Sequence, residues 1–98
     1  MAEVTIVYWR DIPAQVIAGR GRRAVKIPLP ERFEQAIDRA AMKVGATGTD
    51  AYLEEWRKAP PVTVEGDDRA AAEAVAARLD ADYDAGRLRA LIGNDGRA

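Results

Sequence analysis

The sequence contains neither cysteine nor histidine among its 98 residues. Without cysteine it can form no disulfide, no thiolate nucleophile and no zinc ribbon, and without histidine the Ser–His and Cys–His pairs of nucleophilic catalysis are excluded. No pair of carboxylates is placed by the sequence in an apolar pocket, so general acid–base catalysis cannot be argued. The sequence therefore predicts no catalytic residue, no metal site and no cofactor. It leaves enzymatic activity open but favours a protein without one.

The sequence also lacks a charge excess and a long hydrophobic run. Fifteen basic and sixteen acidic residues give a net charge of −1, whereas proteins that bind nucleic acid in bulk carry a basic excess. No segment approaches the roughly 18–20 consecutive apolar residues that span a bilayer, and Glu3 stands where a signal peptide would carry lysine. We expect a soluble, cytoplasmic protein with no membrane association, for which nucleic acid is not an expected partner.

The spacing of the apolar residues predicts an α+β fold. Residues 4–9 alternate as in a strand, Pro13 marks a corner, and residues 14–18, 24–29 and 62–65 form further short extended runs. Helical spacing predicts helices over residues 30–44, with Pro30 at the first position, over residues 50–58 with Tyr52, Leu53 and Trp56 buried, and from residue 67 or 68 onwards. The order β-β-(β)-α-α-β-α predicts a two-layer sandwich. Its small antiparallel or mixed sheet, of about three or four strands, carries about three helices on one face.

Residues 1–93 are expected to form one domain, and residues 94–98 a frayed tail. Near the end of the domain, Leu88, Leu91 and Ile92 leave the apolar stripe of the last helix. They either close the far end of the core or form an exposed patch for a partner. The sequence leaves both alternatives open.

Two stretches are candidates for a binding surface. Gly19-Arg20-Gly21-Arg22-Arg23 surrounds flexible glycines with three arginines, and guanidinium groups bind carboxylates and phosphates through paired donors. The alternative is a charged hairpin turn that keeps an edge strand from aggregating. Tyr8-Trp9-Arg10 combines aromatics with an arginine, as interaction hot spots do. Here the favoured alternative is that Tyr8 and Trp9 are core residues on opposite faces of the strand.

Four stretches carry a resemblance to a known family. The first is residues 7–16, of which Tyr8-Trp9-Arg10-Asp11-Ile12-Pro13 is the most specific part. The others are Arg22-Arg23, residues 29–34 with 36–38, and residues 50–56. Together, over roughly residues 4–90, they resemble the small bacterial "virulence factor" domain family, which includes the C-terminal part of conserved virulence factor C-type proteins. The name describes a phenotype of some members and no reaction. The resemblance implies a place beside folate- and corrinoid-dependent one-carbon enzymes, such as methylenetetrahydrofolate reductase and methyltransferases, and it supplies no catalytic residues.

Three functions follow as hypotheses. The first is a non-catalytic accessory protein, a small subunit beside a one-carbon or methyl-transfer enzyme, with a homodimer left open. The second is a binding protein or enzyme for a small phosphate, carboxylate or folate-like ligand, which requires a concave pocket between the first strand and the helices. The third is a nucleic-acid-binding module. For all three the expected contact residues are the aromatics and arginines of the two stretches: Tyr8, Trp9, Arg10, Arg20, Arg22 and Arg23.

Overall fold

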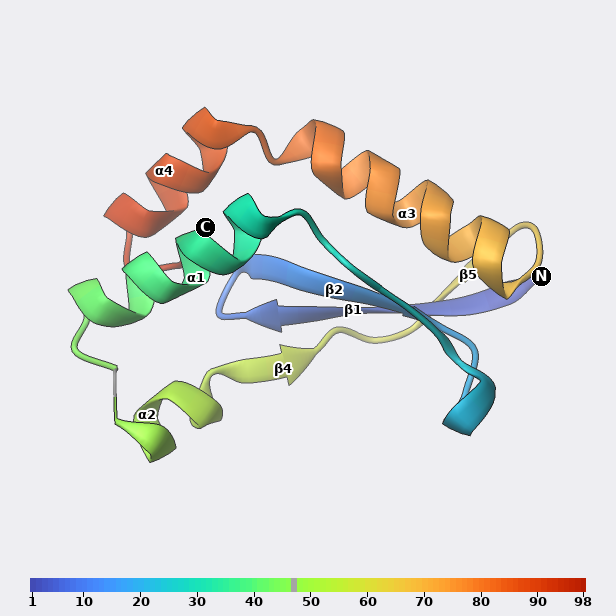
Figure 1. Ribbon diagram of the computed structural model, residues 1–98, viewed down its shortest axis with the longest axis horizontal. Helices are drawn as coiled ribbons and strands as arrows, with labels where there is room; N and C mark the ends of the chain where they lie inside the picture. The colour runs from blue at the N-terminus through green and yellow to red at the C-terminus, as the bar shows by residue number, and fades with distance from the viewer. Residues whose placement is uncertain (47) are drawn as a thin grey trace.

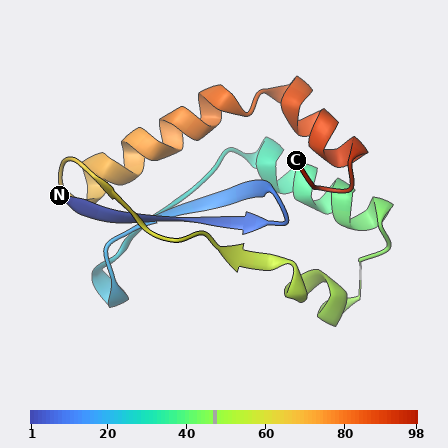
Figure 2. The ribbon, with the colours of Figure 1, turned by 180° about the vertical axis from the view of Figure 1, so that it is seen from behind.

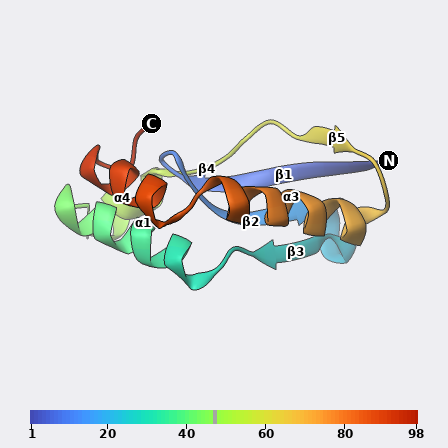
Figure 3. The same cartoon turned by 90° about the horizontal axis from the view of Figure 1, so that it is seen from above.

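The computed structural model describes residues 1–46 and 48–98, and of Thr49 it describes the backbone alone. Within these residues, five strands form one antiparallel sheet: β1 (Ala2–Trp9), β2 (Ile12–Ala18), β3 (Val25–Pro28), β4 (Trp56–Lys58) and β5 (Val62–Val64). The helices are α1 (Glu31–Lys43), α2 (Thr49–Glu54), α3 (Asp68–Asp82) and α4 (Ala85–Gly93), with a short 3-10 turn, η1 (Gly21–Arg23). Figure 1 shows α1, α3 and α4 on one side of the sheet, and Figure 3 shows the same layer from above. The predicted two-layer α+β fold is confirmed, with one more strand and one more short helix than expected.

β1 is the central strand of the sheet. It pairs with β2 along one edge, while its other edge is shared by two short strands, β4 beside Val7–Trp9 and β5 beside Ala2–Val4. Pro60 and Pro61 lie between β4 and β5, and proline has no N–H to continue a ladder. The chain therefore leaves β1 for a few residues and returns to it, as Figure 2 shows from behind.

The predicted helix over residues 50–58 is only half correct. Helix α2 ends at Glu54, and Trp56 begins β4 directly opposite Trp9 of β1. A six-residue helix gains little from its own hydrogen bonds, so pairing with the edge of β1 determines the conformation of the following residues. As a result Tyr52 and Trp56 are half-buried, whereas Leu53, expected in the buried stripe, is 57% exposed.

The core lies between the sheet and the helices. Its largest fully buried side chains include Trp9, Ile12 and Phe33. Leu88 and Leu91 are also buried, and Ile92 packs against the core. Of the two alternatives left open by the sequence, these residues therefore close the far end of the core. Helix α4 separates from α3 just before them. None of the described helices is long and apolar enough to cross a membrane.

The C-terminal segment 94–98, for which the sequence predicts fraying, makes specific contacts in the structure. The backbone N–H of Asp11 donates to the Gly96 carbonyl at 2.8 Å, and the N–H of Ala98 donates to the Asp11 carboxylate at 2.7 Å. Gly96 is buried and has φ +81°, and a Cβ placed there would lie 3.1 Å from the Trp9 ring. Glycine thus allows this segment to lie against the turn between β1 and β2, which local composition alone does not reveal.

Candidate functional site

The six residues predicted to bind a ligand or partner fall into two groups near opposite ends of β1. Tyr8, Trp9 and Arg10 lie at its C-terminal end, and Arg20, Arg22 and Arg23 lie at η1 near its N-terminal end. Arg20 is placed there by an ion pair with Glu3, at 2.7 Å. A strand rises about 3.3 Å per residue, so roughly 20 Å separate Glu3 from Trp9. The two predicted stretches do not form one site.

Trp9 is a structural residue. Its side chain is fully buried, its indole N–H donates to the Tyr52 carbonyl at 3.0 Å, and its ring stacks on that of Tyr52 with 6.0 Å between centroids. These contacts attach α2 to the end of β1. Trp9 therefore offers no surface to a partner, in agreement with the favoured alternative of a core residue.

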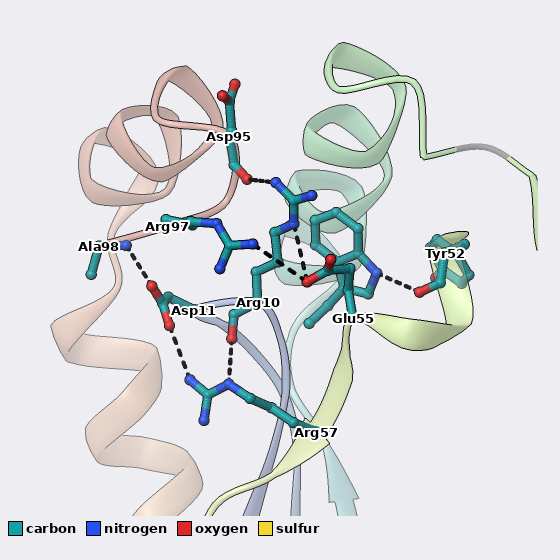
Figure 4. A network of polar contacts seen from close by, with 9 residues as sticks. Arg10, Asp11, Tyr52, Glu55, Arg57, Asp95, Arg97 and Ala98 are labelled. Carbon is teal, nitrogen blue, oxygen red and sulfur yellow. Dashed lines mark hydrogen bonds and ion pairs between the residues drawn. The ribbon is translucent and has the colours of Figure 1, made fainter. Parts of the chain in front are cut away.

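Arg10 acts as a clamp inside the fold. It adopts a left-handed backbone conformation with φ 53° in the turn between β1 and β2, which is uncommon for a residue with a side chain. Its Nη1 donates to the Asp95 carbonyl at 2.7 Å, and its Nε lies 3.3 Å from the Glu55 carboxylate. Figure 4 shows this guanidinium between the C-terminal segment and the residues that follow α2. Most of the side chain is buried, so Arg10 joins three segments rather than facing solvent.

Tyr8 leads to a candidate site, a groove of about 530 Å³ between β1, β4 and α4. We call it the arginine groove. Its charged and aromatic lining residues come from segments far apart in the sequence: Tyr8, Asp11, Arg57, Tyr83, Arg87 and Arg97. Among the described residues that line it, three arginines stand beside a single acidic side chain, Asp11, in a protein whose net charge is −1. This is a local basic surface that overall composition conceals.

Two of these arginines are held in place by tyrosines. The Arg57 guanidinium lies over the Tyr8 ring, 4.6 Å from its centroid, and that of Arg87 lies 3.9 Å from the Tyr83 centroid. Arg57 also donates to the Arg10 carbonyl at 2.9 Å and to the Asp11 carboxylate at 3.0 Å. Cation–π stacking and these hydrogen bonds fix the guanidinium planes before any ligand arrives.

The titrating groups of the groove favour an anionic ligand. The carboxylate of Asp11 accepts hydrogen bonds from the Ala98 N–H and from Arg57, and these two donors, the N–H first, lower the pKa of Asp11. Burial, and then the neighbouring Tyr83, raise the pKa of Tyr8, so its hydroxyl stays protonated at neutral pH and can donate. The single acidic side chain of the described lining is thus already engaged. The arginines also have partners, Asp11 for Arg57, Glu55 for Arg97 and the Asp82 carbonyl for Arg87, but each guanidinium carries several N–H donors, so donors remain for a ligand.

The predicted arginines at η1 are more exposed than those of the arginine groove. Arg22 and Arg23 are exposed in η1, and the Arg20 side chain is 81% exposed although it pairs with Glu3. Within residues 1–46 and 48–98, no three acidic side chains lie close enough together to hold a metal ion.

Sequence reasoning found Tyr8 but missed the other cationic and aromatic members of the groove. Arg57 falls within the predicted helix over residues 50–58 but lies in β4, and Tyr83 packs against the core while it also lines the groove. Their positions in the sequence lie up to about 90 residues from Tyr8. No local motif links them, so only the pairing of β4 with β1 and the path of α4 could have revealed the groove.

A family model described as "Virulence factor" matches residues 7–92. The chain belongs to the virulence factor family. The match includes Tyr8, Asp11, Arg57, Tyr83 and Arg87 of the groove, while Arg97 lies beyond its end. No curated protein and no solved structure matches this virulence factor domain.

Proposed function

We propose that this virulence factor domain is an accessory protein that holds an acidic segment of a protein partner in the arginine groove. The observation that carries the proposal is a groove of about 530 Å³ whose lining contains three arginines and one acidic side chain, Asp11, which is already engaged. Arg57 pairs with Asp11, and Arg97 lies 3.7 Å from Glu55, a carboxylate outside the lining. Guanidinium groups bind carboxylates through two parallel hydrogen bonds, and such charge-assisted bonds are about twice as strong as neutral ones.

The exposure of the groove favours a segment of a protein over an enclosed small molecule. The side chains of Arg57 and Arg97 are 49% and 57% exposed, whereas small-molecule sites typically bury most of the ligand surface. Tyrosine and arginine are also, with tryptophan, the residues enriched at the energetic centres of protein interfaces. The groove has the composition of such a centre and lies at the surface.

The resemblance noted in the sequence suggests which partner to examine first. It implies a small subunit beside a folate- or corrinoid-dependent one-carbon enzyme, and we propose a methyl-transfer enzyme of that class as the first candidate. A homodimer is the alternative partner, and the mass of the purified complex distinguishes the two.

A charge reversal in α4 tests the proposed function. Arg87→Glu places a carboxylate in the groove, whereas Arg89→Glu makes the same change two residues away in a residue that does not line it. Tagged wild type and both variants are purified from native cells after chemical cross-linking, and the cross-linked sites are mapped by mass spectrometry. We expect an acidic partner segment linked near residues 57–59 and 83–98 in the wild type and in Arg89→Glu, and its loss in Arg87→Glu. Equal retention by both variants would contradict the proposal.

A second candidate function is the binding of a small phosphate or carboxylate ligand. It is favoured by the volume of the groove, about 530 Å³, which lies within the usual range of roughly 300–1,000 Å³ for ligand pockets. Native mass spectrometry of the purified protein distinguishes the candidates. A small anion retained by the wild type and lost in Arg87→Glu supports small-ligand binding. A wild-type protein that retains no small anion and binds only the partner segment excludes small-ligand binding.

A further inference from the structure

A second hollow, of about 320 Å³, lies beside η1 on the other face of the sheet. Its side-chain lining includes Thr5, Ile17, Arg20, Lys26 and Lys58. None of these residues belongs to the arginine groove. We call this hollow the lysine site, and it is independent of the function proposed above.

The register of the sheet brings these side chains to one face. Thr5 lies opposite Ile17, and Ile17 lies opposite Lys26, so the three form a row across β1, β2 and β3. Residues directly opposite each other point to the same side of a sheet, and neighbours along a strand alternate. Val4, the neighbour of Thr5, is buried in the core. Thr5 and its row therefore point away from the helices.

Lys58 joins the same face from the far side of β1. It lies opposite Val7, which is two residues from Thr5 and so shares its face. Lys26 on β3 and Lys58 on β4 thus flank the middle strands. In Figure 1 this is the side of the sheet opposite α3, with η1 and α2 beneath its two ends.

The charges of the lysine site are all of one sign. Its lining, within the described part of the chain, contains three cations and no carboxylate. Arg20 is partly neutralised by Glu3, so Lys26 and Lys58 are its main charges. Lysine binds phosphate as a point charge, and threonine hydroxyls commonly contact phosphate oxygens. Among the described residues, none that lines the hollow has an aromatic side chain on which a nucleic-acid base could stack.

The spacing of the two lysines indicates the size of the anion. Three strand spacings separate β3 from β4. Along the strands, the row of Lys26, Ile17 and Thr5 is offset by two residues from the pair of Lys58 and Val7. Together these two displacements place the backbones of the two lysines roughly 16 Å apart. A lone phosphate could be reached by both ammonium groups only if both side chains bent far inwards. We propose that the lysine site binds a short phosphate chain, with a diphosphate group as its smallest ligand.

The test is a titration of isotope-labelled protein with inorganic pyrophosphate and with orthophosphate, followed by amide NMR at fixed ionic strength. We expect pyrophosphate to shift signals around residues 17–21, 26 and 58 and to bind about tenfold more tightly than orthophosphate. The double variant Lys26→Gln/Lys58→Gln should weaken pyrophosphate binding at least about tenfold. The matched control Arg22→Gln/Arg23→Gln, which removes the same charge from η1, should weaken it less than about twofold.

Equal weakening in both double variants would overturn the proposal, because binding would then follow net charge alone. The absence of shifts at millimolar pyrophosphate would also overturn it. ADP distinguishes the source of the diphosphate. Affinity for ADP within about twofold of that for pyrophosphate supports recognition of the phosphate chain alone, and an ADP affinity more than about tenfold higher contradicts it.

Discussion

The two ends of β1 use arginine in opposite ways. At the C-terminal end, Arg10 and Arg57 are fixed by carbonyls and carboxylates from the following turn, from the end of α2 and from segment 94–98 (Figure 4). At the η1 end, Arg22 and Arg23 extend into solvent. Ordering a free arginine on binding costs side-chain entropy of up to about 2 kcal/mol. Arginines that the fold already holds therefore form the better receptor, even though the η1 arginines form the more conspicuous sequence motif.

The largest expected effect is a loss of stability at the C-terminal end of β1. Trp9→Ala removes a fully buried indole together with its stacking on Tyr52, and we expect it to lower the free energy of unfolding by about 3–5 kcal/mol. Urea denaturation measures this loss. Trp56→Ala is the matched control, because Trp56 is only half-buried. The structural role assigned to the buried Trp9 would not hold if the two tryptophan variants lost the same stability.

A smaller effect is expected from acid. Because hydrogen bonding lowers the pKa of Asp11 in the folded protein, its charged form contributes stability above its ordinary pKa of about 3.9, and that contribution is lost as the pH falls through the lowered value. The wild type should exceed Asp11→Asn in unfolding free energy at pH 7, and the difference should shrink between about pH 4 and pH 2. Urea denaturation across this range checks it, with Asp82→Asn as an exposed control. A difference that is constant with pH would contradict the assigned contacts.

The smallest effect is expected at the η1 end. Arg22→Gln and Arg23→Gln change exposed side chains, and we expect each to move Tm by less than about 3 °C. Thermal unfolding followed by circular dichroism measures the shift. A larger decrease would show that the turn arginines stabilise the fold and would remove the contrast with the other end.

The fold could be predicted from the sequence where its patterns are local. Alternation in β1 and the apolar spacing of α1 were sufficient, because each reflects burial of one face of one element. The assignment failed at Trp56, where the apolar spacing fitted a helix but the open edge of β1 favoured a strand. The groove was beyond sequence reasoning for a related reason, since Tyr8, Arg57 and Arg87 meet only after β4 and α4 are placed.

The contact between Asp11 and Ala98 spans 87 positions of the chain, and this has a kinetic consequence. The β1–β2 hairpin can form from neighbouring residues, whereas closing so long a loop is slow and entropically costly. We expect the groove to assemble last during folding and to open first in the native protein. In hydrogen exchange, the Asp11 amide, bonded to Gly96, should exchange faster than the Thr5 amide, which faces β2 within the hairpin. The arginine groove, which we propose as a binding surface, would then form late in folding and open transiently in the native protein.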